Sequence, residues 1–482
     1  MEHEYNSLFI GGDWVAPSSS ATITVASAAT EERLGQVPEA VQADVDAAVA
    51  AARRAFDDSS GWAHWEPVRR AEAMERLADA LDKRAEQFAQ LVSRENGMPL
   101  STSRASEAVI GSAMLRYYAA LVRKQGTEEF RPALVGNGTT VVRRDPVGVV
   151  AAIVPWNFPQ TLTMFKLGPA LAAGCTIVLK PAPETALDAF LLAEAVAEAG
   201  LPAGVVNIVP ADREASNYLV SHPGVNKVAF TGSTATGRVI AEQCGRLLRP
   251  VTLELGGKSA AIILDDADLE PSLDAFFDST MNNNGQTCLI GTRVLAPRSR
   301  YQTIVDTLTD YFGALPVGDP LDEATRIGPL VSQRQRERVE GYIAKGRAEG
   351  GRITTGGGRP AGLDRGWFVQ PTIFADVDNT FTPAREEIFG PVLCILPYDD
   401  VDDAVRIAND SEYGLGGTVW SADKDRALDV ARRVQTGSIG INGYALDPGA
   451  PFGGVKASGL GRELGPEGLA AYQQLKSIYR TA

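Results

Sequence analysis

The spacing of apolar positions predicts helices that alternate with strands over most of the chain. Between Asp44 and Phe56, apolar residues recur at helical spacing behind an Asp cap. A longer helix is expected from Pro67 to Gly97, with proline in the first turn, an apolar stripe and glycine as the stop. The run from Ala186 to Ala199 predicts a third helix, closed by glycine, and further helices are expected near 269–281 and 333–349.

Short β-branched runs separate these helices from residue 147 onward. VGVVAAIV, TIVLK, GVVNIVP, KVAF, VTLEL and AAIIL are too apolar for strands with one face in water, so buried parallel strands are the simplest interpretation. A second series follows residue 257 and includes PVLCILPY and GSIGIN. The pattern predicts the α/β class, with two domains built on largely parallel sheets.

Two segments depart from this pattern. Residues 126–144 alternate like a strand, and the C-terminal KSIYRT is similarly extended. Neither has an obvious helical neighbour to pack against, which indicates an added sheet that serves assembly.

One uncharged stretch, Pro146 to Phe165, is long enough to suggest a membrane span. It contains internal prolines together with Asn157 and Gln160, so a helix in lipid would be broken and would carry polar groups. A buried strand running into a loop is the better interpretation, and we expect no membrane association.

Charge and composition narrow the class of protein. The 482 residues include 46 Lys and Arg against 60 Asp and Glu, a formal charge of -14, and no cluster of cations stands out. Nucleic-acid binding is therefore not expected. The four cysteines have no CxxC spacing and there are three histidines, so we expect neither disulfides nor a metal site. The polar, acidic N-terminus lacks the features of a secretory signal, and a reducing, cytoplasmic location fits.

A glycine loop that follows a strand is the first candidate for chemistry. In FTGSTATG, Gly232 and Gly237 let the backbone approach a pyrophosphate at a helix N-terminus, although the spacing is neither GxGxxG nor a P-loop. Taken alone, this loop fits a simple turn equally well.

Three further residues have a structural and a chemical interpretation. Cys288 is either a small buried residue or, in its polar glycine-containing segment, an accessible nucleophile. Glu254 ends an apolar strand and is either salt-bridged or a general base of raised pKa. Asn157, between two prolines, is either a turn residue or an oxyanion donor.

Taken together, these motifs resemble the NAD(P)-dependent aldehyde dehydrogenase superfamily. Their order and spacing match across essentially the whole chain, in the strings PWNFP, LKPAPETAL, FTGSTATG, LELGGKSA, GQTC, EEIFGP and PFGGVKASGLGREL. The resemblance implies oxidation of an aldehyde to a carboxylic acid.

The resemblance also implies catalytic roles. Cys288 matches the nucleophile that forms a thiohemiacetal and then a thioester, with its oxyanion held by the Asn157 amide and the Cys288 backbone N–H. Glu254 matches the base that activates water for hydrolysis. Lys166 and Glu463 match positions that relay the proton outward.

Cofactor and substrate contacts are implied in the same way. The expected cofactor contacts are Ile153, Trp156, Lys180, Gly232, Ser233, Gly237, Glu387 and Phe389, and the expected substrate pocket is Phe158, Phe165, Leu289 and Phe452. The apolar pocket predicts a medium aliphatic or aromatic aldehyde. Pro183 stands where many NAD-preferring relatives carry an acidic residue, with Glu184 one place later, so NAD is favoured and NADP stays open.

The resemblance further implies a three-part organisation. A Rossmann-like cofactor-binding domain is expected over 1–124 and 145–256, a catalytic domain over 257–455, and bridging or oligomerisation segments over 125–144 and 465–482, in a homodimer or homotetramer. Two alternatives remain. A CoA-acylating relative would use the same cysteine but commonly lacks the base at Glu254, and a non-catalytic protein on this fold would have no need of all three candidate catalytic groups.

Overall fold

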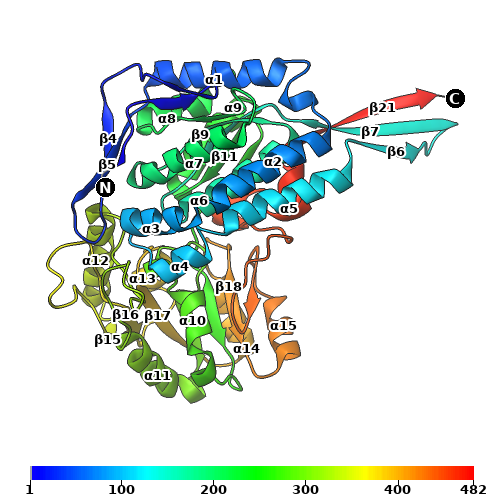
Figure 1. Cartoon of the computed structure of the whole chain (residues 1–482). Coiled ribbons are helices and arrows are strands. Elements are labelled where there is room, and N and C mark those ends of the chain that lie inside the picture. Colours follow the sequence, from blue (N-terminus) through cyan, green and yellow to red (C-terminus); the bar gives the residue numbers. More distant parts are fainter. Residues whose placement is uncertain (1–2, 482) are drawn as a thin grey trace.

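The computed structural model describes residues 3–481 and contains two large sheets, each covered by helices on both faces (Figure 1). The first sheet has eight strands in the order β20-β12-β11-β8-β9-β10-β2-β3. Its five central strands run parallel. They are β8 (Val149–Ile153), β9 (Thr176–Lys180), β10 (Val206–Ile208), β11 (Lys227–Thr231) and β12 (Val251–Glu254). The α/β class is confirmed.

Antiparallel strands close both edges of this sheet. β2 (Leu8–Ile10) pairs with β10 and with β3 (Asp13–Val15), and β20 (Gly459–Leu460) pairs with β12. The predicted domains leave out β20, since a two-residue strand has no apolar pattern of its own. The predicted domain limits stay a prediction.

Helices cover the first sheet on both faces, which explains its wholly apolar strands. One face carries α1 (Gln42–Asp57), α8 (Arg213–Ser221) and α9 (Thr234–Arg246). The other carries α6 (Pro159–Ala173) and α7 (Ala186–Ala199), with α2 (Pro67–Asp82) and α5 (Ile110–Gln125) packed outside them.

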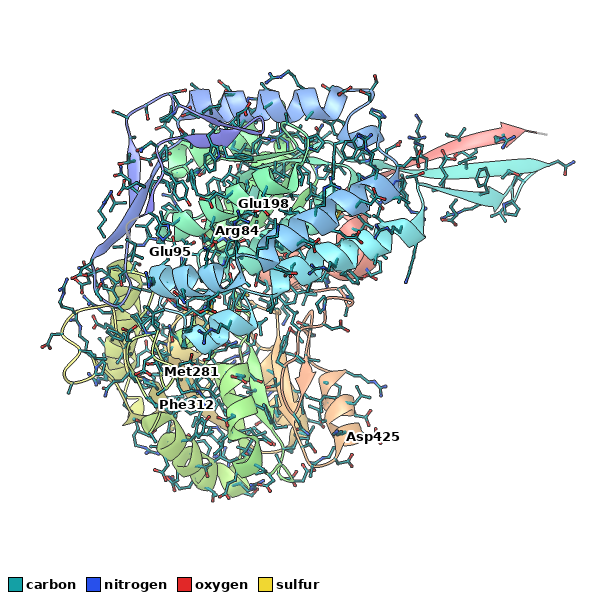
Figure 2. The ribbon with its side chains drawn as sticks, viewed as in Figure 1. Arg84, Glu95, Glu198, Met281, Phe312 and Asp425 are labelled. Carbon is teal, nitrogen blue, oxygen red and sulfur yellow. The ribbon has the colours of Figure 1, made fainter. Side chains whose placement is uncertain are left out.

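The second sheet has seven strands in the order β15-β16-β17-β14-β13-β18-β19, parallel except for the β15–β16 pair. Separate apolar clusters fill its two faces, and Met281 and Phe312, labelled in Figure 2, belong to one of them. The strands are β13 (Ala260–Ile263), β14 (Arg293–Pro297), β15 (Arg352–Thr355), β16 (Thr372–Ala375), β17 (Val392–Tyr398), β18 (Gly417–Trp420) and β19 (Gly440–Ile441). The helices are α10 (Leu273–Thr280), α11 (Tyr301–Gly313), α12 (Gln333–Ala348), α13 (Thr382–Arg385), α14 (Val401–Asn409) and α15 (Lys424–Ala431).

Two helix predictions need correction. The expected helix from Pro67 to Gly97 is two helices, α2 and α3 (Ala85–Asn96), because the chain turns at Arg84, which pairs with Glu198 at 2.6 Å (Figure 2). This turn lets α2 pack on α5 while α3 packs on α4 (Leu100–Ala105). Apolar spacing continues through the turn and does not reveal it.

The first predicted helix begins earlier than expected. α1 starts at Gln42, and Asp44 lies inside its first turn, where Oδ2 accepts a hydrogen bond from the Val41 N–H at 2.9 Å. Asp44 therefore accepts the backbone N–H of the N-cap residue Val41 from within the helix, which is the second of the two hydrogen bonds of a capping box.

The predicted extended segments form a three-stranded arm. β6 (Glu128–Pro132), β7 (Gly138–Pro146) and β21 (Gln473–Thr481) pair antiparallel and extend away from the body of the molecule (Figure 1). The strands are confirmed, whereas the role in assembly stays a prediction. A separate small sheet contains β1 (His3–Glu4), β5 (Arg33–Pro38) and β4 (Thr22–Ala26).

Within residues 3–481, no helix is long and apolar enough to cross a membrane. The suspected span divides into β8, a loop and the start of α6.

Candidate functional site

The carboxyl ends of three neighbouring strands of the first sheet meet at one edge. β8 leads to Asn157, β11 leads to Gly232 and Ser233, and β12 ends in Glu254. Each large sheet with its helices is called an α/β unit. The loop that carries Cys288 lies between β13 and β14 of the second unit and approaches this edge of the first. Ligands of parallel α/β sheets bind at the carboxyl ends of the strands, so this edge is the candidate site.

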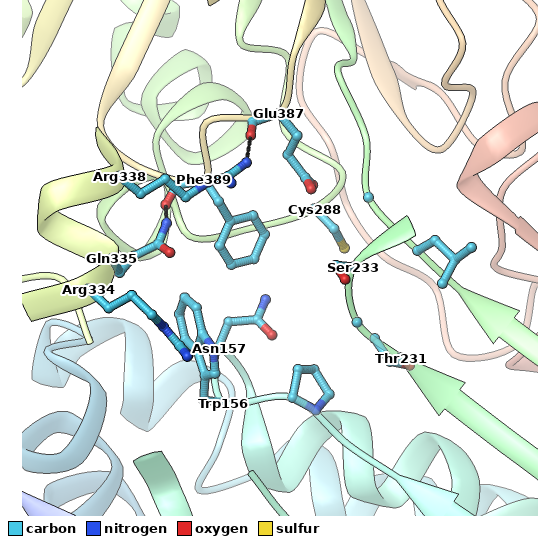
Figure 3. Close-up of a pocket in the computed structure, with 14 residues that line it drawn as sticks. Trp156, Asn157, Thr231, Ser233, Cys288, Arg334, Gln335, Arg338, Glu387 and Phe389 are labelled. Atoms are coloured by element: carbon cyan, nitrogen blue, oxygen red, sulfur yellow. Dashed lines mark hydrogen bonds between the residues drawn. The ribbon is translucent and has the colours of Figure 1, made fainter. Parts of the chain in front are cut away.

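A cavity of about 480 Å³ lies between the two units. Figure 3 shows the Cys288 sulfur and the Glu387 side chain on one side of it, with Trp156 and Asn157 on another. The lining residues are Pro155, Trp156, Asn157, Thr231, Gly232, Ser233, Leu255, Gly256, Cys288, Arg334, Gln335, Arg338, Glu387 and Phe389.

Cys288 is a partly exposed free thiol at this cavity, whereas Cys175, Cys244 and Cys394 are buried. Its backbone is packed against Gly257, where an added Cβ would lie 2.3 Å from the Cys288 carbonyl oxygen. Burial raises the pKa of the Cys288 thiol well above its usual value, and the carboxyl groups of Glu387 and Glu254 raise it further. These surroundings therefore favour the thiol over the thiolate.

Asn157 is buried and held by neighbouring amides. Its side-chain Nδ2 donates to the Gln286 backbone carbonyl at 2.9 Å. Its backbone carbonyl accepts hydrogen bonds from Asn283 Nδ2 at 2.8 Å and from Asn96 Nδ2 at 3.2 Å. An amide nitrogen has two hydrogens, so one remains for a ligand oxygen. Gln286 is in turn fixed by its Oε1, which accepts the Val331 N–H at 2.9 Å.

Glu254 is buried behind the cavity wall. Neither of its carboxyl oxygens has a hydrogen-bond partner among the described residues. Burial raises its pKa well above the usual value, and Glu463 raises it further against the opposing charges of Lys166 and Arg462. Gly453 leaves the necessary room, since a Cβ there would lie 2.5 Å from Glu254 Oε1. A buried carboxyl with unused oxygens and a raised pKa is suited to accept a proton from a neighbouring group.

Lys166 and Glu463 form a buried ion pair next to this carboxyl. Lys166 Nζ lies 2.7 Å from Glu463 Oε1 and donates to Thr231 Oγ1 at 2.6 Å, and both charged side chains are almost fully inaccessible to solvent. Glu463 Oε2 has no partner within residues 3–481. The structure thus brings together two predicted residues that lie 297 positions apart in the sequence.

Removing one partner of this pair is expected to destabilise the protein strongly. Lys166→Met leaves the Glu463 carboxylate buried and unpaired, so the free energy of unfolding should fall by about 3–5 kcal/mol. Lys166→Met combined with Glu463→Leu should recover most of that loss, because both charges are then absent. Urea unfolding of the two variants measures the effect, and equal stability of the single and double variants would show that the pair is not coupled.

A second cavity of about 580 Å³ shares Pro155, Trp156, Thr231, Gly232 and Arg334 with the first. The N-terminus of α9 lies beside it, with Ser233 as the cap and no acidic residue in the first turn. Such a helix end is suited to bind a pyrophosphate.

Among the predicted cofactor contacts, Ile153 and Lys180 line the second cavity. Gly237 lies within α9 and lines neither the first nor the second cavity. Burial lowers the pKa of Lys180 to about 8, against the opposing charges of Glu184 and Asp212.

Glu387 and Phe389 come from the loop before β17 and line the first cavity. Glu387 Oε1 accepts the Gly257 N–H at 2.9 Å, which leaves the other oxygen for a ligand hydroxyl. Burial raises the pKa of Glu387 to about 7, against its hydrogen bond from Gly257. The Phe389 ring packs edge-on against Trp156 with centroids 5.3 Å apart.

The four predicted substrate contacts lie elsewhere. Phe165 and Phe452 are buried in the main apolar core, and Phe158 and Leu289 pack against it. None of the four lines either cavity. Phe452 instead exchanges two backbone hydrogen bonds of 2.7 Å with Glu463 and so helps to place that carboxyl. Their contact with substrate stays a prediction.

Three residues of α12 that line the first cavity were not predicted from the sequence. Arg338 donates to the Glu387 carbonyl, Gln335 Nε2 donates to the Phe389 carbonyl at 2.7 Å, and Arg334 also lines the second cavity (Figure 3). Arg334 and Arg338 are four residues apart and share a helix face. That spacing was the available signal, but it is equally typical of a solvated surface.

The aldehyde dehydrogenase family model matches residues 14–478. The chain is 56% identical to the geranial dehydrogenase of Castellaniella defragrans over 479 residues, covering 99% of each protein. It is similar to a Mycobacterium tuberculosis aldehyde dehydrogenase solved with NAD+, with a TM-score of 0.97 and 51% identity over 99% of this chain and 98% of that one. A Pseudomonas syringae aldehyde dehydrogenase solved with NAD+ and octanal gives a TM-score of 0.94 at 39% identity, over 98% and 96% of the two chains.

The fold and the similarity along the whole length place this chain in the aldehyde dehydrogenase family. It is an enzyme of the oxidoreductase class that acts on aldehydes.

Proposed function

We propose that this enzyme oxidises a medium-chain aliphatic or aromatic aldehyde to the carboxylic acid, with NAD as cofactor, through a covalent intermediate on Cys288. One observation carries the proposal: Cys288 and Asn157 line one cavity at the carboxyl ends of the strands, where β12 ends in the buried Glu254. The small-molecule partners are therefore the aldehyde and NAD.

The first step is attack of the Cys288 sulfur on the aldehyde carbon. The C–S bond forms, and the carbonyl π electrons move to the oxygen. Because burial and two nearby carboxyl groups raise the thiol pKa, Glu254 accepts the thiol proton. The free hydrogen of Asn157 Nδ2 and the Cys288 N–H hold the new oxyanion.

The second step collapses this thiohemiacetal to a thioester. NAD supplies the hydride acceptor when it is bound. Asn157 releases the oxygen as the carbonyl forms again, and Trp156, Leu255 and Phe389 give the cavity an apolar wall that excludes water during the transfer.

The last step is hydrolysis of the thioester. Glu254 first loses the thiol proton by way of the neighbouring Glu463 and Lys166. Ionised again, it takes a proton from a water molecule, and the hydroxide adds to the carbonyl carbon. The C–S bond then breaks to release the acid and the Cys288 thiolate, which takes the proton back from Glu254. The presence of Glu254 supports hydrolysis over transfer of the acyl group to CoA.

The cofactor fits the two joined cavities. Lys180 and Ile153 would hold its adenosine end, Gly232 and the start of α9 its pyrophosphate, and Glu387 and Phe389 its nicotinamide ribose. The first-turn N–H groups of α9 that Ser233 does not cap, and the unused oxygen of Glu387, would supply the hydrogen bonds that this placement needs.

Two observations support an apolar aldehyde as substrate: the charged groups at the first cavity already have partners, and two relatives are named for apolar aldehydes or bound to one. Arg334 and Arg338 reach the first cavity, but both guanidinium groups are engaged, with Glu184 and with the Glu387 carbonyl. Arg334 is thus already paired with a carboxylate, which makes it a weaker partner for a substrate carboxylate. The relatives described above act on geranial or are bound to octanal, which are apolar aldehydes.

A panel of aldehydes tests this substrate class. Each additional buried methylene contributes about 0.8 kcal/mol, so kcat/KM should rise about threefold to fourfold per carbon until the cavity is filled. Aliphatic, terpenoid and aromatic aldehydes are compared with semialdehydes by the absorbance of the reduced cofactor, with NAD and NADP in parallel. If a semialdehyde gives the highest kcat/KM, the proposal of an apolar aldehyde substrate is wrong.

The three-stranded arm is proposed to pair with a second copy of the chain, in a homodimer or homotetramer. Phe130, Leu475 and Tyr479 are 60%, 70% and 79% exposed on it. Large apolar side chains gathered on one projecting sheet are typical of an interface. A reducing cytoplasmic location also fits, because Cys288 must remain a free thiol.

A further inference from the structure

Arg334 connects the two sides of the cofactor cleft. It lies in the first turn of α12, and its guanidinium forms an ion pair of 2.9 Å with Glu184 Oε1, which belongs to the short helical turn Pro183–Thr185 on the first α/β unit. Arg334 is also shared by the linings of the two cavities, and Figure 3 shows its side chain beside Trp156.

Glu184 lies in a region of mixed charge. The second cavity is lined by the cations Lys180, Arg213 and Arg334 and by the anions Glu184 and Asp212. Asp212 is occupied as the cap of α8, where its side chain accepts the Ala215 N–H at 2.9 Å. Glu184 is the other carboxylate of this lining, and it pairs with Arg334, whose side chain is 84% exposed.

We propose that Arg334 determines coenzyme specificity by masking Glu184, so that the adenosine pocket accepts a ribose 2′-phosphate as well as a 2′-hydroxyl. A free carboxylate accepts hydrogen bonds from ribose hydroxyls and repels a 2′-phosphate. A guanidinium bound to that carboxylate cancels the repulsion. This inference rests on the placement of the adenosine end proposed above.

The competing interpretation is an ordinary surface ion pair. Such pairs contribute between about 0 and 1 kcal/mol to stability and would leave coenzyme binding unchanged. The chain offers a matched control in Arg298 and Asp399, an exposed pair of 2.6 Å that lines neither cavity.

Equilibrium binding of NAD+ and NADP+ by titration calorimetry separates the two interpretations without turnover. In Arg334→Ala, the unmasked carboxylate should weaken NADP+ binding about tenfold, because one charge compensation is lost, and should change NAD+ binding less than about threefold. In Glu184→Gln, NADP+ should bind more tightly than in the unchanged enzyme. When Arg334→Ala is added to Glu184→Gln, the further loss of NADP+ affinity should be much smaller than the loss in Arg334→Ala alone. Arg298→Ala should change the dissociation constant of neither coenzyme.

Two results would overturn the proposal. If the ratio of the NADP+ to the NAD+ dissociation constant in Arg334→Ala stays within about twofold of its value in the unchanged enzyme, the contact is an ordinary surface ion pair. An undiminished loss of NADP+ affinity in the Glu184→Gln background would show that Arg334 does not act through Glu184. Lys180→Ala tests the placement separately, because it should weaken both coenzymes. If it weakens neither, the adenosine placement fails and this inference with it.

Discussion

Cys288→Ala is expected to abolish aldehyde oxidation, with a loss of kcat of roughly 10⁴-fold or more, because no other group can carry the covalent intermediate. Cys288 is the partly exposed cysteine at the cavity, and the other three are buried. Steady-state formation of the reduced cofactor measures the loss, and calorimetry should show that the variant still binds NAD+.

Cys394→Ala is the matched control for this variant. Cys394 is a fully buried residue of β17 and lines neither cavity, so the same substitution should lower stability but leave turnover of the folded enzyme largely intact. Robust oxidation by the Cys288→Ala enzyme would remove the covalent scheme altogether.

Glu254→Gln is expected to separate hydride transfer from hydrolysis. Without the base, the thioester should accumulate, so one equivalent of reduced cofactor per subunit forms in a burst and the steady rate then falls roughly 10²–10⁴-fold. Rapid-mixing absorbance records both phases. Because Glu254 is suggested to assist thiol deprotonation too, the burst itself should be slower than hydride transfer in the unchanged enzyme.

The pH dependence gives a second readout of the same carboxyl. Hydrolysis needs the ionised form of Glu254, and burial raises its pKa, so kcat should fall with decreasing pH at values above the usual carboxyl range. Glu254→Gln should lose this acid limb.

Glu107 provides the matched control for Glu254. It is another buried glutamate, and burial raises its pKa to about 7, but its oxygens are occupied by hydrogen bonds from the Gln160 N–H and the Thr161 hydroxyl. Glu107→Gln should therefore show no burst and should keep the acid limb. An unchanged steady-state rate in Glu254→Gln would identify another group as the base.

Local sequence predicted most of the elements that build the site. The runs that became β8, β9, β11 and β12 are apolar on both faces, because helices cover both sides of the sheet. The same signal failed at Arg84, where the apolar stripe of α2 continues into α3 and the turn depends on packing between helices. Helix ends are set by such contacts as much as by local preference.

The sequence by itself determined the class of fold, the identity of the candidate nucleophile, base and oxyanion donor, and the resemblance to aldehyde dehydrogenases, because these depend on residue type and order along the chain. The tertiary structure alone decided which groups meet. Lys166 pairs with Glu463, and Arg334 crosses the cleft to Glu184, over 297 and 150 positions of sequence. It also placed Phe165 and Phe452 in the core and polar α12 side chains at the cavity, since burial and proximity arise only when distant segments pack together.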